Sequence, residues 1–155
     1  MKLTDGTILT RDHLPHPYEF ALVVKTRDYE TDSQGIVNNA NYLHYLELTR
    51  HAYCESRGYS FGDMTADGIV AVLRRAEIDY IRPLHGNQLF VSCLWVERKG
   101  PRFVFHQDLF LPSESEGSPV DLDAVVARAQ TTVVATRDGH LTKGDELADR
   151  LDIHS

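Results

Sequence analysis

The order of hydrophobic patterns along the chain is the feature that most restricts its fold. One alternating segment, residues 18–24, is followed by a long helical pattern at residues 39–57. Four strand patterns then follow, at residues 69–81, 88–99, 102–111 and 124–136, with no second long helical pattern between them. A sheet that wraps around one central helix has this order of elements. The sequence therefore predicts an α+β fold, with an antiparallel sheet of about five strands.

The long helical pattern is amphipathic. Its apolar or small positions are Tyr42, Tyr45, Leu46, Thr49, Ala52, Tyr53 and Ser56, and the polar positions opposite are His44, Glu47, His51 and Glu55. At ~1.5 Å per residue such a helix is nearly 30 Å long. Gly58 suits its C-terminus. We expect its apolar face to form the centre of the core.

Length and composition indicate one domain. The chain has 155 residues, of which 42% are hydrophobic, enough to fill a single core at about residues 18–136, and residues 137–155 are expected to form a polar tail. The net charge of −7, with scattered Lys and Arg, argues against nucleic-acid binding. No apolar run is long enough for a signal peptide or a membrane span, so we expect a cytoplasmic protein.

Several apparent motifs are weak. Cys54 and Cys93 are the only cysteines, and we expect reduced packing residues rather than nucleophiles or zinc ligands. His44 and His51 share a helical face but lack a third ligand at metal spacing, so no metal is expected. The G-x-S-x-G pattern at residues 58–62 follows a helix instead of a strand, which argues against a hydrolase elbow. No cofactor is expected.

Residues 27–42 carry the pattern that indicates chemistry. A carboxylate, Asp32, is followed by a turn glycine, Gly35, and by the predicted helix start at Asn39. This arrangement can aim a base or nucleophile at a group held by the positive end of a helix. From the pattern alone, Asp32 also fits an ordinary turn aspartate. Glu30 is expected to be a polar loop residue, and Glu77 a satisfied strand residue.

The same region resembles a known family. Residues 24–30 (VKTRDYE) and 35–40 (GIVNNA), followed by residues 77–84 (EIDYIRPL) and Gly86, are similar to the hot-dog-fold acyl thioesterases related to 4-hydroxybenzoyl-CoA thioesterase. The closest resemblance in motif is to the plant acyl-lipid thioesterases and their bacterial relatives. It covers roughly residues 18–136. One departure is Gly86-Asn87, where the family often has Gly-Asp, and we expect it to affect a turn more than the chemistry.

The resemblance implies roles for individual residues. Asp32 stands at the position of the catalytic carboxylate. The backbone N–H of Asn39 stands where the family stabilises the thioester oxyanion. Gly35 would permit the tight turn, while Asn38 and Tyr42 are candidate substrate contacts. Lys99 and Arg102 are candidate contacts for the phosphates of coenzyme A (CoA).

The implied reaction is hydrolysis of an acyl-CoA or acyl-carrier-protein thioester to an acid and a thiol, as part of lipid metabolism. We expect a fatty or β-ketoacyl group, and an aromatic acyl group is the alternative. Asp32 could attack the thioester carbonyl or activate water. The rival functions are a non-catalytic acyl-thioester binding module and a dehydratase. The resemblance also implies a homodimer or a dimer of dimers, such as a homotetramer.

Overall fold

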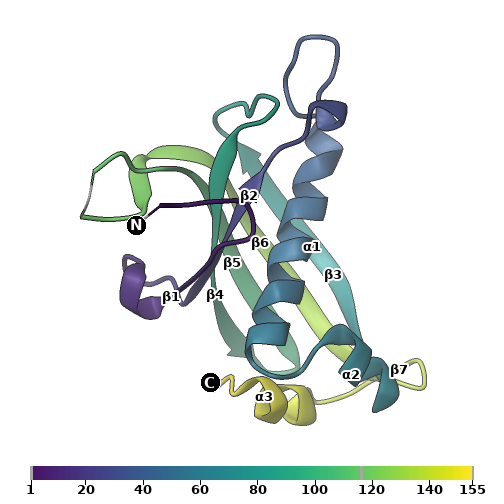
Figure 1. Ribbon diagram of the computed structural model, residues 1–155. Helices are drawn as coiled ribbons and strands as arrows, with labels where there is room; N and C mark the ends of the chain where they lie inside the picture. The colour runs from purple at the N-terminus through teal and green to yellow at the C-terminus, as the bar shows by residue number, and fades with distance from the viewer. Residues whose placement is uncertain (1, 116, 155) are drawn as a thin grey trace.

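A curled antiparallel sheet and one long helix against its concave face make up most of the molecule, in a computed structural model that describes residues 2–115 and 117–154 (Figure 1). The strands lie in the order β1-β2-β4-β5-β6-β3, and β7 pairs with β6. The strands are β1 (Ile8–Thr10), β2 (Phe20–Lys25), β3 (Ile69–Tyr80), β4 (Leu89–Lys99), β5 (Arg102–Pro112), β6 (Val120–Arg137) and β7 (His140–Leu141). The helices are α1 (Asn39–Ser56), α2 (Phe61–Ala66) and α3 (Asp145–Leu151), with short 3₁₀ helices η1 (Arg11–His13) and η2 (Asp28–Glu30).

Helix α1 begins and ends as its sequence predicts. The side chain of Asn38 accepts a hydrogen bond from the Ala40 N–H at 3.0 Å and so caps the N-terminus. Gly58, with φ 78°, provides the left-handed residue after the C-terminus. The buried face matches the expectation at Tyr42, Tyr45, Leu46, Thr49 and Tyr53. It also includes Arg50 and Cys54, whereas Ser56 is exposed.

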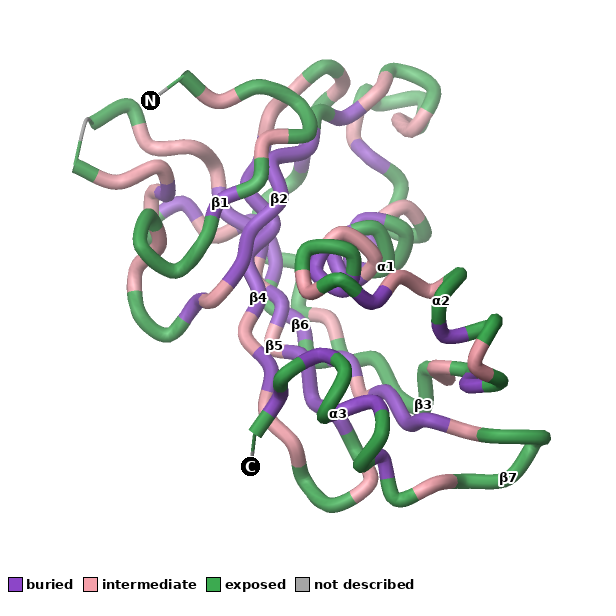
Figure 2. The backbone as a smooth tube through the Cα atoms, turned by 60° about the horizontal axis from the view of Figure 1, so that its bottom comes forward, coloured by how far each residue is buried: buried purple, intermediate pink, exposed green. Residues whose placement is uncertain are grey.

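The apolar core lies between α1 and the concave face of the sheet. Tyr45 packs on Phe90 with ring centroids 4.9 Å apart, and Tyr53 meets Phe20 edge-on at 5.7 Å. A second apolar cluster lies on the convex face, where Tyr18 meets Phe110. Buried positions accordingly gather along β2 and β4 (Figure 2).

The five long strands occur where the sequence predicts them, and six shorter elements among the described residues were not predicted. These are β1, η1, η2, α2, β7 and α3. Helix α3 lies in the segment expected to be a polar tail, yet Leu147, Ala148, Leu151 and Ile153 are buried in the main core. The expected core of residues 18–136 therefore extends to the C-terminal region. A seven-residue helix offers too few periodic positions to be recognised from sequence.

Strand β3 forms one edge of the sheet. Among the strands of residues 2–115 and 117–154, it pairs with β6 alone, and most of its twelve residues are exposed or half-buried, including Val70, Leu73 and Tyr80. A long edge strand with unpaired backbone groups is a common place for a second chain to add. Among the described residues, no helix is both long and apolar enough to cross a membrane.

Candidate active site

A short hairpin between η2 and α1 presents Asp32. The N–H of Asp32 donates to the Ile36 carbonyl at 2.8 Å, and the Gly35 N–H donates to the Asp32 carbonyl at 3.0 Å. Gly35 has φ 74°, a conformation that glycine adopts without strain. Thr31 and Val37 form a bridge at the base of the hairpin. The tight turn expected at Gly35 is therefore present.

The two carboxylate oxygens of Asp32 have different surroundings. Oδ1 accepts backbone N–H groups from Gln34 at 2.8 Å and Ile36 at 3.3 Å. The described part of the chain provides no hydrogen bond to Oδ2, and the residue is exposed. The hydrogen bonds to Oδ1 orient the carboxylate and leave Oδ2 available to accept a proton or attack a carbonyl. The turn and catalytic interpretations of Asp32 are thus compatible.

The start of α1 carries a free backbone donor close in sequence to Asp32. Asn38 caps the Ala40 N–H, and none of the described residues accepts a hydrogen bond from the Asn39 N–H. The first N–H groups of a helix have no partner within it, and the helix dipole makes them favourable for an anion. Tyr80, at the end of β3, donates to the Asn39 carbonyl at 3.4 Å. A thioester oxyanion would find a suitable donor here.

Residues 84–87, which follow β3, contact the Asp32 hairpin and the preceding η2. Val37 N–H donates to the Leu84 carbonyl at 2.8 Å. Both oxygens of the Asp28 carboxylate accept from the Asn87 side-chain amide at 3.1 Å, and a Cβ on Gly86 would collide with the same carboxylate. The Asn87 side chain thus donates to the Asp28 carboxylate, whereas an Asp at position 87 would place a second negative charge beside it. Gly86 and Asn87 therefore lie in a turn that contacts η2.

Tyr42, a predicted substrate contact, lies in the core instead of on an open surface. It is only 3% exposed and packs edge-on against Tyr45 and Tyr80. Its position one turn into the helix turns the ring toward the sheet. Tyr80 is 49% exposed and lies beside the helix start, so it is better placed than Tyr42 to contact an acyl group. Its exposure could not be read from sequence because it depends on β3 being an edge.

Lys99 and Arg102 lie at the opposite end of the sheet from Asp32. They face each other across the β4–β5 turn, whereas the Asp32 hairpin lies near the start of β4 at Leu89. Ten residues of extended strand separate the ends, about 33 Å at ~3.3 Å per residue. Lys99 also pairs with Glu97 at 3.0 Å. Within one chain, these two side chains therefore lie far from Asp32 along the sheet.

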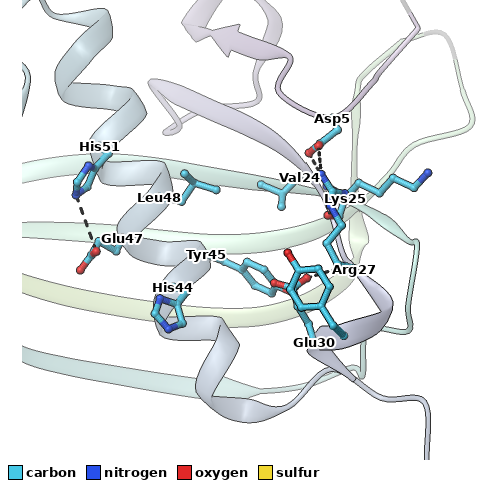
Figure 3. Close-up of a pocket in the computed structure, with 11 residues that line it drawn as sticks. Asp5, Val24, Lys25, Arg27, Glu30, His44, Tyr45, Glu47, Leu48 and His51 are labelled. Carbon is cyan, nitrogen blue, oxygen red and sulfur yellow. Dashed lines mark hydrogen bonds and ion pairs between the residues drawn. The ribbon is translucent and has the colours of Figure 1, made fainter. Parts of the chain in front are cut away.

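A groove of about 420 Å³ runs along the flank of α1 beside η2. Eleven residues line it: Asp5, Val24, Lys25, Arg27, Tyr29, Glu30, His44, Tyr45, Glu47, Leu48 and His51 (Figure 3). Glu30, expected to be a simple loop residue, is hydrogen-bonded to Tyr45 at 3.0 Å. Sequence reasoning missed this contact, although the spacing of Glu30 from Arg27 fits the capping box found at η2.

The cysteines and histidines form no competing site. Cys54 and Cys93 are buried and free, and burial raises the pKa of the Cys54 thiol to about 12, so it remains protonated and unreactive at neutral pH. His44 and His51 lie along the groove, and His51 approaches Glu47 at 3.9 Å. Within residues 2–115 and 117–154, no cluster of three metal-binding side chains is found.

Comparisons with known proteins identify the family to which the chain is similar. The family model described as "Thioesterase superfamily" matches residues 34–118. The putative acyl-CoA thioesterase YneP of Bacillus subtilis is 32% identical over 91 residues, covering 58% of this chain and 66% of that protein. A chloroplastic acyl-acyl carrier protein thioesterase of Arabidopsis thaliana, ATL2, is 32% identical over 107 residues, covering 64% of this chain and 57% of that protein.

Solved structures share the fold. The probable thioesterase YbaW of Escherichia coli superimposes with a TM-score of 0.69 at 30% identity, covering 85% of this chain and 96% of that one. This similarity confirms the predicted hot-dog architecture, in which an antiparallel sheet wraps a long helix. The chain therefore belongs to the thioesterase superfamily and is a thioester hydrolase with the hot-dog fold.

Proposed function

We propose that this thioesterase cleaves acyl-CoA thioesters with Asp32 as its catalytic carboxylate. The observation that carries the proposal is the orientation of Asp32, with Oδ1 held by two backbone N–H groups and Oδ2 free. Asp32 lies seven residues before Asn39, whose N–H would donate a hydrogen bond to the thioester oxygen as negative charge develops on it. A non-catalytic binding module would have no need of an oriented, unpaired carboxylate oxygen.

Two routes through Asp32 lead to the same products. In one, Oδ2 attacks the thioester carbonyl, the thiolate leaves and takes up a proton, and water hydrolyses the resulting anhydride. In the other, Oδ2 takes a proton from water while the water oxygen attacks, and that proton passes to the departing sulfur. Either way the acid and the thiol are released and Asp32 is regenerated. The Asn39 N–H stabilises the tetrahedral oxyanion in both routes.

The acyl group in this proposal is fatty or β-ketoacyl. Exposed apolar side chains lie near the helix start, among them Leu43 on α1, Tyr80 at the end of β3 and Ile81 directly after it. The relatives' names include acyl-CoA and acyl-carrier-protein thioesterases. Tyr80 also presents an exposed ring that could stack on an aromatic acyl group, which supports the second candidate, an aromatic acyl-CoA. A cytoplasmic role in lipid metabolism is part of the same proposal.

The working unit in this proposal is a homodimer or a dimer of dimers. Strand β3 has an unpaired edge, and its exposed residues include Leu73 and Val70. Pairing of two β3 edges would extend the sheet across a two-fold axis and cover the exposed flank of α1. It would also bring a second chain near Tyr80 and the helix start. Lys99 and Arg102 stay candidate phosphate contacts in this proposal, from the same chain or from the partner.

Thiol release from a panel of saturated acyl-CoAs, β-ketoacyl thioesters and benzoyl-CoA tests the proposal. We expect Asp32→Asn to lower kcat by at least ~10³-fold, because an amide can neither attack nor accept the proton. For the wild type, kcat/KM should rise with chain length until the pocket is full, since each buried methylene contributes up to ~0.8 kcal/mol.

A matched control is Asp149→Asn, an exposed carboxylate in α3, which should leave kcat unchanged. Near wild-type turnover by folded Asp32→Asn protein would refute the role of Asp32. A strong preference for benzoyl-CoA, with no trend among the aliphatic substrates, would favour the aromatic candidate instead.

A further inference from the structure

Four hydrogen bonds converge on Glu30, the last residue of η2. Its Oε1 accepts the Arg27 N–H at 2.7 Å and the Tyr45 hydroxyl at 3.0 Å. Its backbone carbonyl accepts the Asn38 N–H and the Asn41 side-chain amide, each at 2.9 Å. Figure 3 shows the side chain of Glu30 directed at the Tyr45 hydroxyl across the gap between η2 and α1.

These donors belong to the elements that would form the oxyanion site. Asn41 and Tyr45 lie in the first two turns of α1, and Asn38 is its N-cap. Asn39, which carries the free N–H, lies between two of these donors in sequence. The Asp32 hairpin begins directly after Glu30. One residue thus joins the helix start to the hairpin that presents the carboxylate.

We propose that Glu30 is a positioning residue that fixes the Asn39 N–H relative to Asp32 during catalysis. This inference rests on the proposed thioesterase function of the site. Glu30 contacts neither reacting group in the structure, so its effect passes through Asn38, Asn41 and Tyr45.

The hydrogen bond between Glu30 and Tyr45 is held in place by the packing around Tyr45. Tyr45 is 3% exposed and held in the core by the rings of Phe90 and Tyr42. Burial, followed by the hydrogen bond to Glu30, raises the pKa of Tyr45, so its hydroxyl remains a donor at neutral pH. Arg27 is tied in turn to Asp5 at 2.6 Å. The Glu30 carboxylate is therefore held by Tyr45 in the core and by Arg27, which is itself paired with Asp5 near the N-terminus.

The test compares three variants of the whole chain. Glu30→Ala removes both bonds to Oε1 but keeps the two bonds to the backbone carbonyl, so it tests the side-chain part of the positioning. It should lower kcat by about ten- to hundred-fold, because a small misplacement of an oriented group has an effect of this order. Glu30→Gln keeps an oxygen that can accept from Arg27 and Tyr45, and should retain most of the activity. Tyr45→Phe should cause a smaller loss, and the double variant Glu30→Ala/Tyr45→Phe should resemble Glu30→Ala because the two changes remove the same bond.

A purely structural role would give a different pattern. It would lower the melting temperature and the folded fraction, but kcat per folded molecule would be unchanged. We expect kcat to fall while KM stays within about two-fold, and we expect no additional loss when Glu30→Ala is placed on Asp32→Asn. Glu55→Ala, an exposed carboxylate on the same helix, is the matched control and should leave kcat unaltered.

Amide hydrogen exchange provides a readout that does not require turnover. Glu30→Ala should speed exchange at Asn38 by at least ten-fold while exchange in the middle of α1 stays constant. Glu30→Gln as harmful as Glu30→Ala would overturn the proposal, because charge rather than hydrogen bonding would then matter. Faster exchange without any change in kcat would also overturn it. If the wild type hydrolyses no thioester, the proposed function fails, and exchange still reports whether Glu30 orders the helix start.

Discussion

At the residue scale, substitutions at Asn39 can distinguish the role of its backbone N–H from the role of its side chain. It is the first residue of α1, and its N–H has no acceptor among the described residues. The preceding Asn38 has φ −65° and ψ 138°, an extended conformation that is compatible with a following proline. Proline is also well tolerated at the first position of a helix. Proline at position 39 can therefore delete one N–H with little disturbance of the helix.

We expect Asn39→Pro to lower kcat by about 10²- to 10³-fold, the effect of removing one oxyanion donor, and Asn39→Ala to keep most of the activity. Circular dichroism and steady-state kinetics with the same acyl-CoA would measure helix content and kcat. The assignment of the backbone N–H is wrong if alanine is as damaging as proline, or if a folded proline variant turns over normally.

At the scale of secondary-structure elements, Asp67 ties α3 to the rest of the fold. Its carboxylate accepts hydrogen bonds at 2.7 Å from the hydroxyl of Tyr59 and from the guanidinium of Arg150 in α3. Its carbonyl accepts from Arg137, which also pairs with Glu146 of α3 at 2.6 Å. This polar clamp lies outside the buried contacts of Leu147 and Leu151. The C-terminal helix is thus held by charge on one side and by burial on the other.

The clamp should weaken in acid. The hydrogen bonds from Tyr59 and then Arg150 lower the pKa of Asp67 below its ordinary value of 3.8. Because the folded pKa is below the unfolded one, the stabilisation is complete above about pH 4 and disappears as pH falls through the folded value. NMR signals of Ala148 and Leu151 should shift over that range. Asp67→Asn, which cannot titrate, should show a much smaller shift, and equal shifts in both proteins would contradict the clamp.

At the scale of the whole molecule, the sequence predicted the parts that depend on long periodic patterns. Helix α1 and the long strands were recognisable because their apolar positions repeat over many residues. Helix α3 was not, since its few buried positions occur in a polar segment. At the site, the motif located Asp32 and Gly35, but the burial of Tyr42 depends on how distant strands curl together, and the distance of Lys99 from Asp32 depends on which end of the sheet each segment occupies. Periodicity does not contain that information.

The open edge of β3 predicts that assembly and activity are linked. Sedimentation should show a dimer or tetramer at micromolar concentration, and specific activity should fall on dilution below the dissociation constant. Leu73→Lys, on the exposed edge strand, should weaken association and activity together. Ile8→Lys, an equally exposed apolar position on the opposite edge at β1, serves as the control. A fully active monomer at micromolar concentration would contradict the proposed assembly.

The manner in which Asp32 is held has a consequence for how such a site can evolve. Its Oδ1 is bound by the main-chain N–H groups of Gln34 and Ile36, not by their side chains. Mutational drift at Ser33 and Gln34 can therefore change the tip of the hairpin without reorienting the carboxylate, provided that Gly35 keeps its left-handed turn. Lineages could vary the exposed surface of the hairpin tip while inheriting the same orientation of the Asp32 carboxylate.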